Sequence, residues 1–402
     1  MPHSPFSRRH ILLGAATLTV WARLPRFAHA AERDPRLIVL VLRGALDGLA
    51  VVPPVGDPTY AALRGPLAVP TEGAGAALPL DGHFALNAAM PKFHGLYHSG
   101  EAMLVHAVAT PYRDRSHFDG QDVLESGHAG PGATLDGWLN RAAAALPAGD
   151  RVAAQGGLAV GPMVPLILRG PAPVMNWSPA VLPEVAPDTV ARLQELYDHS
   201  DEQLARALRT AAAADRMTMG DAPPKGKGGG LPRAFIAAAE GAGRLLARPD
   251  GPRLAALSFD GWDTHAGEGP NGGRLSSLLG GLDVAVDALR TTLGPAWRDT
   301  VVVAATEFGR TAAANGTEGT DHGTGTVAFL AGGAVKGGRV IADWPGLGPA
   351  ALYQQRDLAP TTDLRSILKG VLADHLGLSE KVLAETVFPE SAPTKPVKDL
   401  LA

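Results

Sequence analysis

The sequence contains no cysteine. This absence excludes disulfide bonds, thiolate metal ligands and cysteine nucleophiles. Any metal ion that the protein binds must therefore be held by histidine, carboxylate or hydroxyl groups.

The chain also lacks an excess of positive charge. It has 36 Lys and Arg residues against 40 Asp and Glu, for a formal net charge of −4, and the basic residues form no continuous stripe. Proteins that bind nucleic acid need clustered Lys and Arg to contact the phosphates. The composition therefore argues against nucleic acid as the main partner.

The apolar run near the N-terminus is too short to span a membrane. It extends from Ile11 to Ala22, about twelve residues, whereas a hydrocarbon core about 30 Å thick needs about twenty. It follows Arg8 and Arg9 in an order that resembles a twin-arginine export signal, and a small-residue cleavage site follows it. We expect residues 1–30 to be a signal peptide, with a bacterial mature protein that is periplasmic or secreted and has no stable membrane anchor after processing. A short membrane anchor is the alternative.

The remaining sequence has the pattern of a large α/β domain. The chain has 402 residues, of which 46% are hydrophobic, so it can bury a sizeable core. Short, continuous apolar segments such as residues 37–42 are typical of central strands that are covered on both faces. They alternate with amphipathic helices such as residues 272–294. This alternation predicts a three-layer α/β/α sandwich with a mostly parallel central sheet over residues 31–402.

The pattern changes between about residues 134 and 249. Two helical segments flank an extended segment at 158–177, and a loop rich in Gly and Pro follows at 220–233. We expect a largely helical insertion beside the sheet.

Polar side chains gather where the predicted strands end, which is where open parallel sheets bind their ligands. One acid at a strand end is ordinary turn chemistry, but five such positions with acids, a serine and histidines suggest one site. In chain order the candidates are Asp47; Ser116, His117 and Asp119; Asp260, Asp263 and His265; Glu307 and Arg310; and Asp321 and His322.

These residue types support metal-dependent hydrolysis. Carboxylates and imidazoles suit Zn²⁺ or Mn²⁺, whereas sets of oxygen ligands suit Mg²⁺ or Ca²⁺. Two cations about 3.5–4 Å apart can clamp a phosphoryl or sulfuryl group and activate a hydroxyl nucleophile. The hypothesis is one or two divalent ions with Asp47, Asp260, Asp263, His265, Glu307, Asp321 and His322 as ligands, Ser116 and Arg310 as catalytic residues, and His117 and Asp119 as supporting residues.

Simpler structural explanations remain open for the same residues. Asp47 precedes a glycine and could be a turn or cap residue. Ser116 with Asp119 could form a capping box, in which Asp replaces the usual Glu. Glu307 could form a salt bridge with Arg310, which would otherwise clamp a substrate oxyanion.

Six segments together resemble a known family. In chain order they read "LVLRGALDGL", "RDRSHFDGQ", "DGWDTH", "TEFGRT", "GTDHGTG" and "TTDLRSILKGVL". They are similar to the bacterial proteins of domain-of-unknown-function family 1501, which are commonly exported by the twin-arginine route and are grouped with the alkaline phosphatase/sulfatase superfamily. The similarity covers essentially the whole chain after the leader, and it implies an alkaline phosphatase-like fold.

The resemblance also implies how two ions would be held. One ion would be bound by Asp263 (or Asp260), His265 and His322, and the other by Asp47, Ser116 and Glu307. The chain departs from the superfamily at the fourth strand end, where Glu307 and Phe308 replace an Asp-His pair. Unless His117 or Asp321 replaces the missing imidazole, this departure favours Ca²⁺, Mg²⁺ or a single ion.

The expected function is hydrolysis of a phosphate or sulfate ester, either a small anionic ester or a sulfated or phosphorylated glycan. With no Cys and no matching Ser-x-Pro-x-Arg segment, the formylglycine nucleophile of the usual sulfatases is excluded. The main alternative is a non-catalytic metal- or glycan-binding envelope protein that keeps the fold. An isomerase resembling phosphoglycerate mutase is disfavoured, because export would remove it from glycolytic substrates.

Overall fold

The computed structural model describes residues 34–147, 150–179 and 230–402, with short pieces between 193 and 210. Pro35–Ala402 form one compact unit. The predicted signal peptide lies outside the described residues. Within the described part of the chain, every helix is too short or too polar to cross a membrane.

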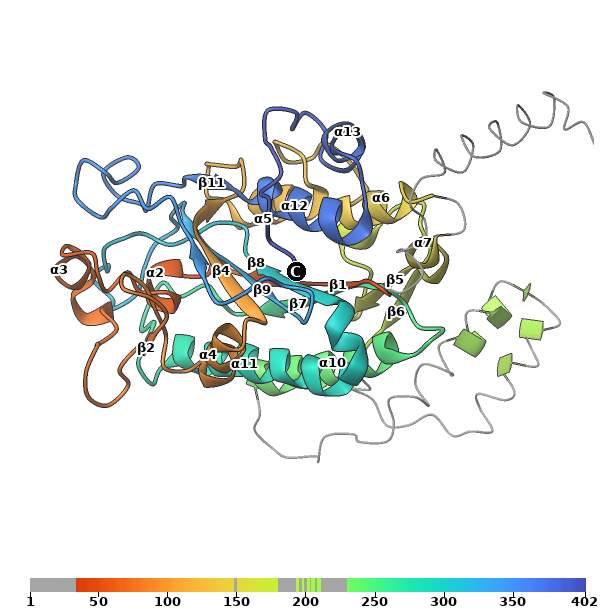
Figure 1. Ribbon diagram of the computed structural model, residues 1–402, viewed down its shortest axis with the longest axis horizontal. Coiled ribbons are helices and arrows are strands. Elements are labelled where there is room, and N and C mark those ends of the chain that lie inside the picture. The colour runs from red at the N-terminus through yellow and green to blue at the C-terminus, as the bar shows by residue number, and fades with distance from the viewer. Residues whose placement is uncertain are drawn as a thin grey trace, which may run out of the picture. The chain divides into compact units, whose positions relative to one another are not determined.

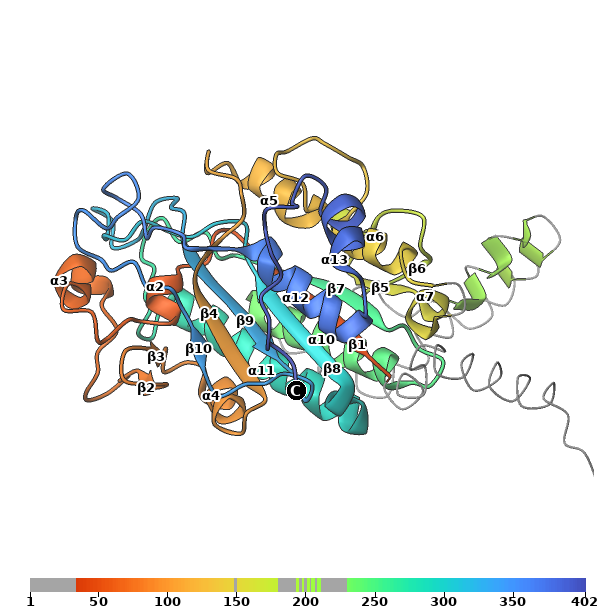
Figure 2. The ribbon, with the colours of Figure 1, turned by 45° about the horizontal axis from the view of Figure 1, so that its top comes forward.

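A nine-stranded sheet forms the centre of this unit (Figure 1). Its strands are ordered β10-β4-β9-β8-β1-β7-β5-β6, and β11 also pairs with β4. Every pairing is parallel except those of β9 with β4 and β8. Figure 2 shows β4, β9 and β8 side by side. The strands are β1 Arg36–Arg43, β4 Ala102–Ala109, β5 Gly157–Val160, β6 Val174–Trp177, β7 Leu254–Asp260, β8 Thr300–Ala305, β9 Thr326–Ala331, β10 Val340–Ile341 and β11 Thr362–Asp363, with a separate pair β2 Leu78–Pro79 and β3 Ala85–Leu86.

Strand β1 explains why the sheet needs helices on both faces. Its side chains alternate between two cores: Ile38 and Leu40 pack into one, and Leu37 and Val39 pack into the other. Successive strand residues point to opposite faces. A continuous apolar run therefore requires cover on both sides, as the sequence predicts for residues 37–42.

Helices supply that cover. Figure 1 shows α4, α10 and α11 along one face of the sheet and α5, α6, α12 and α13 along the other. This arrangement confirms the predicted sandwich with a mostly parallel sheet. The helices are α2 Gly48–Val51, α3 Tyr60–Arg64, α4 Pro91–His98, α5 His117–Ser126, α6 Trp138–Ala144, α7 Arg151–Gln155, α10 Gly230–Ala247, α11 Arg274–Leu293, α12 Leu364–Leu376 and α13 Glu380–Val382, with short turns η2 Gly65–Leu67, η3 Leu166–Leu168, η5 Gly294–Asp299 and η6 Leu383–Val387.

The stretch 134–249 contributes strands as well as helices. Within it, β5 pairs with β7 and with β6, so the extended segment widens the main sheet. Helix α10 packs against α11 and β7. Residues 180–192 and 211–229 lie outside the described residues, so the largely helical character expected there stays a prediction.

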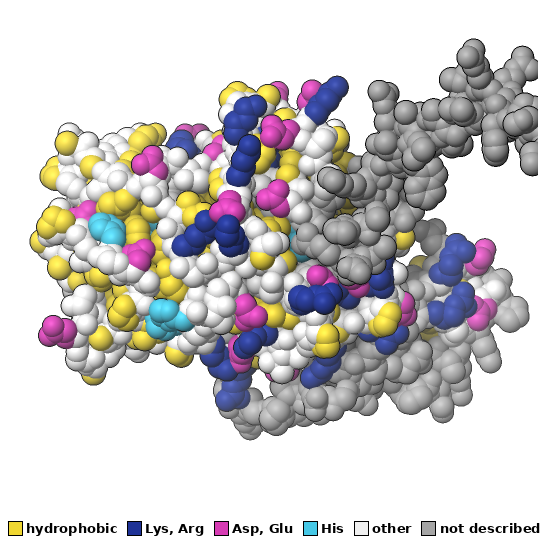
Figure 3. Space-filling view, viewed as in Figure 1, with side chains coloured by type: hydrophobic (Ala, Val, Ile, Leu, Met, Phe, Trp, Pro, Cys, Tyr) yellow, Lys and Arg dark blue, Asp and Glu magenta, His cyan; other side chains and the backbone are white. Residues whose placement is uncertain are grey.

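The parallel pairing brings the carboxyl ends of β1, β4, β7 and β8 to one edge of the sheet. Because β9 is antiparallel, its first residue lies at this same edge, and the loop before it joins the others. All the candidate residues lie in or beside these loops. On the face shown in Figure 3, the Lys and Arg side chains of the described residues are interspersed with Asp and Glu.

Candidate metal centre

The loops after β1 and β7 meet closely at Gly44. Its φ is +120°, and a Cβ atom there would lie 2.5 Å from the backbone nitrogen of Asp263. Any larger residue would force the two loops apart. Glycine therefore allows the backbone of the β1 loop to reach the site.

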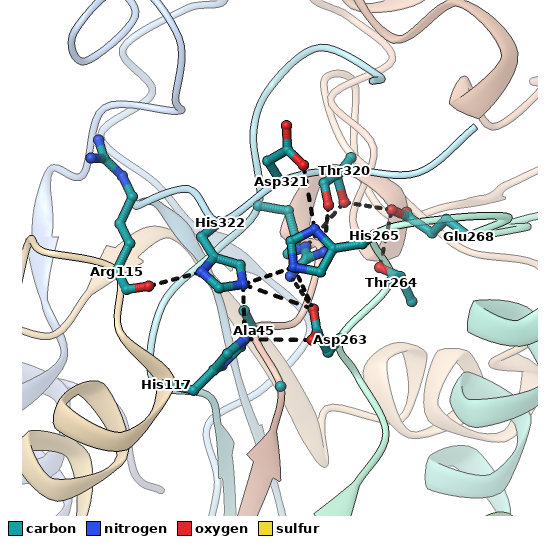
Figure 4. Close-up of polar contacts among 12 residues, drawn as sticks. Ala45, Arg115, His117, Asp263, Thr264, His265, Glu268, Thr320, Asp321 and His322 are labelled. Atoms are coloured by element: carbon teal, nitrogen blue, oxygen red, sulfur yellow. Dashed lines mark hydrogen bonds and ion pairs between the residues drawn. The ribbon is translucent and has the colours of Figure 1, made fainter. Parts of the chain in front are cut away.

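Three side chains from three different loops converge at this edge. His117 begins α5 after β4, Asp263 follows β7, and His322 precedes β9. One ligand atom from each lies within 4.8 Å of the other two. The Nε2 atoms of His117 and His322 are 3.0 Å apart, and His117 Nε2 lies 3.7 Å from Asp263 Oδ2. Figure 4 shows the three side chains pointing toward one another.

The outer nitrogen of His322 is bonded to the backbone. Nδ1 lies 2.8 Å from the carbonyl oxygen of Arg115. A carbonyl oxygen only accepts, so Nδ1 carries the proton and Nε2 presents a lone pair to the cluster. Burial, and to a lesser extent the charges of His117, Arg310 and His265, lower the pKa of His322. The ring is therefore neutral at neutral pH, as a ligand must be.

Arg115 is held in an unusual conformation to present that carbonyl. Its φ is +61°, in the left-handed region that few non-glycine residues adopt. Its side chain donates from Nε and Nη2 to Asp357 Oδ2, at 3.0 and 2.7 Å. Strain of this kind persists only where surrounding contacts hold it. The buried Asp357 supplies those contacts.

The outer nitrogen of His117 is bonded to a buried carboxylate. Nδ1 lies 2.8 Å from Glu307 Oε1, which also accepts the backbone N–H groups of Gly44 and Ala45 at 2.9 and 3.1 Å. The second oxygen of Glu307 accepts from the Thr306 hydroxyl at 2.8 Å. Glu307 therefore accepts the Nδ1 proton of His117 and orients Nε2 of His117 toward the cluster.

The Nε2 atoms of His117 and His322 therefore face each other at 3.0 Å. A proton or a metal ion can bridge such a pair, because the Nδ1 atom of each ring is bonded on the far side. A carboxylate or carbonyl that fixes the outer nitrogen is the usual support of a metal-binding histidine. With the Asp263 carboxylate, these residues fit a divalent ion such as Zn²⁺ or Mn²⁺.

The roles of Glu307 and His117 differ from those expected from the sequence. Glu307 was predicted as a ligand and His117 as a supporting residue. In the structure, His117 is in the converging group and Glu307 orients it. His117 thus places an imidazole in the group, although the fourth strand end has none.

His265 adjoins the converging group on its exposed side. Its Nε2 lies 2.9 Å from His322 Nε2 and 3.1 Å from Asp263 Oδ1. Its Nδ1 lies 3.3 Å from Asp321 Oδ1, an oxygen that Asn315 also contacts. His265 is 46% exposed and Asp321 59%. Asp321 therefore supports His265 from outside.

Arg310 secures the carboxylate of the group. Its Nη1 donates to Asp263 Oδ1 at 2.8 Å, and the guanidinium is buried. Burial would raise the pKa of Asp263, but the hydrogen bond and charge of Arg310 lower it below its ordinary value. Arg310 thus pairs with Asp263, whereas the sequence suggested Glu307 or a substrate oxyanion.

Asp47 lies in the buried network behind the converging group. Its Oδ1 accepts from the backbone nitrogens of Leu49 and Ala50 at 3.0 and 3.3 Å, which caps α2. Its Oδ2 pairs with Arg64, whose guanidinium is wholly buried. Both carboxylate oxygens are therefore engaged away from the converging group, so the structure supports the cap explanation of Asp47.

Asp47→Ala should destabilise the fold and leave metal stoichiometry unchanged. Removing one partner of a buried ion pair costs up to about 3–5 kcal/mol, and Glu268, which also faces Arg64, should offset part of that loss. Chemical denaturation and elemental analysis measure the two quantities. Loss of bound metal from a folded Asp47→Ala protein would instead return Asp47 to the ligand set.

The remaining predicted residues lie around the converging group without joining it. Asp260 is the exposed last residue of β7. Asp119 accepts from the Tyr112 hydroxyl at 3.2 Å. Ser116 is the N-cap residue of α5, directly before His117, but its side chain makes no capping hydrogen bond. The capping-box explanation of Ser116 is therefore not supported.

Sequence reasoning missed the buried support behind the site. Glu268, Arg64 and Thr320 are fully buried and linked to one another or to Arg310. Glu268 follows the "DGWDTH" segment within a few residues, which is the one local signal. Its partner Thr320 is distant in the chain, so the contact itself leaves no pattern in the sequence.

Residues 100–387 match the family described as protein of unknown function (DUF1501). The chain belongs to this family. The match includes five of the six segments that carried the resemblance and excludes "LVLRGALDGL". No curated protein is significantly similar to the DUF1501 chain in sequence.

Several solved structures are similar to this DUF1501 chain at low identity and with low TM-scores. Ps i-CgsB with k-i-k-neocarrahexaose is 11% identical, with a TM-score of 0.43 over 90% of this chain and 77% of that one. A 2-O GAG sulfatase is 13% identical, with a TM-score of 0.42 over 92% and 76%. The phosphonate monoester hydrolase of Agrobacterium radiobacter is 13% identical, with a TM-score of 0.34 over 86% and 74%.

Proposed function

We propose that the protein is a metal-dependent hydrolase of a phosphate or sulfate ester, with one divalent ion held by His117, Asp263 and His322. The observation that carries this proposal is the convergence of two imidazole Nε2 atoms, 3.0 Å apart, beside a carboxylate. Each ring is fixed by a specific partner of its Nδ1 atom on the far side. Such fixed orientation is characteristic of metal sites.

The proposed ligand set would leave one coordination position of the ion open. Three protein ligands with one open position are typical of catalytic zinc, whereas structural sites use four. A bound ion would act as a Lewis acid on the ester and lower the pKa of a hydroxyl group beside it. His265 is held by Asp321 next to this group. We assign it the transfer of protons at the open position.

Ser116 is the proposed nucleophile. It stands at the N-terminus of α5, a ten-residue helix whose positive end favours an anionic substrate. In the proposed reaction its hydroxyl gives up its proton, Oγ forms a bond to phosphorus or sulfur, the bond to the leaving alcohol breaks, and that alcohol takes up the proton. Water then releases phosphate or sulfate and restores the hydroxyl.

A single ion fits better than the pair expected from the resemblance. Of the second proposed set, Asp47 is paired with Arg64 and Glu307 is bonded to His117. Buried Arg64 supplies positive charge where Asp47 would otherwise need a cation. Arg310 is likewise paired with Asp263, so we propose that it positions a ligand rather than clamps substrate.

Metal analysis followed by an ester panel tests the proposal. The purified protein is expected to hold one equivalent of Zn²⁺ or Mn²⁺ and to hydrolyse phosphate or sulfate esters only with metal present. Chelation followed by readdition serves as the internal control. Absence of any bound divalent ion would refute the metal site.

A metal-binding envelope protein without catalysis is the second candidate. Among the described residues a single group could hold an ion, which favours this candidate because two-ion hydrolysis needs two. It predicts stoichiometric metal binding with no turnover of any ester. The same panel therefore separates the two functions.

Export by the twin-arginine route is a further part of the proposal. Arg8→Lys with Arg9→Lys should leave the precursor in the cytoplasm, because the export receptor reads that pair. Fractionation of cells that express each form measures this. If the double variant still reaches the periplasm, the leader is of another type.

A further inference from the structure

Glu268 is a fully buried acid that the proposed ligand set does not include. Its Oε2 accepts from the hydroxyls of Thr320 and Thr264 at 2.7 and 3.2 Å. Its Oε1 lies 3.6 Å from Arg64 Nη2 and has no hydrogen-bond partner among the described residues. Burying a carboxyl is costly unless its oxygens are hydrogen-bonded, so the two hydroxyl donors of Glu268 help to keep it in place.

The hydrogen bonds from Glu268 lead to the metal centre in a defined direction. Arg310 Nε lies 3.1 Å from Thr320 Oγ1. A guanidinium only donates, so the Thr320 hydroxyl accepts this bond and gives its own proton to Glu268. Arg310 also donates to the carbonyl of Thr320, and its Nη1 donates to Asp263 at 2.8 Å. Figure 4 shows the hydrogen bond between Thr320 and Glu268, with Asp263 nearby.

We propose that Glu268 is a positioning residue of the metal centre: it holds the Thr320 hydroxyl, which fixes Arg310 and thereby the carboxylate of Asp263. The inference rests on the proposed function, because Asp263 must be a ligand for its position to matter. Arg310, Thr320 and Glu268 are buried, so water cannot substitute for these bonds.

The charges around Glu268 favour its protonated, uncharged form. Asp47 and Glu268 both face Arg64, so two carboxyls share one guanidinium. Burial, and then the charge of Asp47, raise the pKa of Glu268 to about 8. Protonated Glu268 still accepts through Oε2, and the buried cluster is then neutral. A glutamine at this position should therefore keep the function.

Calorimetric titration of the metal-free protein with Zn²⁺ tests the proposal. Glu268→Ala should weaken Zn²⁺ binding on the order of 10- to 100-fold, as loss of an outer partner does in other metal sites. Glu268→Gln should restore affinity close to that of the wild type. Thr320→Val removes the connecting hydroxyl without a change in charge and should match Glu268→Ala.

Asp283→Ala is the matched control. Asp283 is a buried acid of α11 that accepts the backbone N–H groups of Lys92 and Phe93 at 3.2 and 2.7 Å, and none of its hydrogen bonds reaches the metal centre. Its removal should lower the melting temperature and leave Zn²⁺ affinity unchanged. This separates positioning from general loss of stability.

The titrations distinguish the possible failures. A wild-type protein that binds no Zn²⁺ refutes the proposed metal site itself. Wild-type affinity in both Glu268→Ala and Thr320→Val would overturn the positioning role while leaving that site intact. If Glu268→Ala does not fold, Thr320→Val and Glu268→Gln decide: the first must lose affinity and the second must keep it.

Discussion

His322→Ala is expected to abolish metal binding by the folded protein. Nε2 of His322 is the atom on which the group converges: it lies 3.0 Å from His117 Nε2 and 2.9 Å from His265 Nε2. Loss of an outer partner costs about 10- to 100-fold in metal affinity, and removal of a ligand itself should exceed that. Elemental analysis and Zn²⁺ titration measure the effect.

Parallel substitutions compare the neighbouring histidines. His117→Ala should match His322→Ala, since both belong to the converging group. His265→Ala should retain the ion with weaker affinity, because its exposed ring adjoins the group. His98→Ala, on the exposed end of α4, is the control and should change nothing. Full metal occupancy in His322→Ala would show that the group has been assigned the wrong function.

His322→Ala should be less stable to heat than the wild type when Zn²⁺ is present, and equally stable when it is absent. A ligand that binds the native state alone adds RT ln(1 + [L]/Kd) to the free energy of unfolding. The melting temperature of the wild type should therefore rise with Zn²⁺ concentration, while that of His322→Ala should not. Equal melting temperatures of the two metal-free proteins would show that the substitution left the fold intact.

The sheet could be predicted from the sequence because each strand carries its own local signal. The apolar run at 37–42 is β1 with both faces covered, and the helix expected at 272–294 is α11 Arg274–Leu293. The orientation of β9 has no such signal. Its pairing with β4 and β8 depends on how the chain returns across the sheet, and the sequence alone predicted only a mostly parallel arrangement.

The candidate site could be predicted as a region but not as a set of contacts. Strand ends in a parallel sheet meet at one edge, so His117, Asp263 and His322 could be brought together from their positions alone. Which side chains join the converging group depends on the hydrogen bonds and ion pairs that each makes with residues distant in the chain. Glu307 is adjacent to the group but is saturated by donors from the β1 loop, and Asp47 is neutralised by Arg64. Neither partner is visible in a local motif.

Ser116→Ala is expected to reduce kcat by at least about 1,000-fold while Zn²⁺ binding and KM change little, because a lost nucleophile acts in the transition state. The side chain of Ser116 makes no capping hydrogen bond to α5, so truncation should have little effect on stability. A capping serine would instead lose about 1 kcal/mol and keep its activity.

Ser116→Asp sharpens the comparison, because aspartate caps helices as well as serine does but cannot replace an alkoxide nucleophile. If Ser116 is the nucleophile, neither variant should turn over the esters that the wild type hydrolyses, although both should fold and bind Zn²⁺. Turnover is measured at saturating substrate on whichever ester the panel identifies, with wild-type protein treated with chelator as the blank. Full activity in Ser116→Ala would show that the nucleophile is a metal-activated water and not Ser116. The protein would then still be a hydrolase, because His117, Asp263 and His322 would still hold the ion, but Ser116 would have no part in its mechanism.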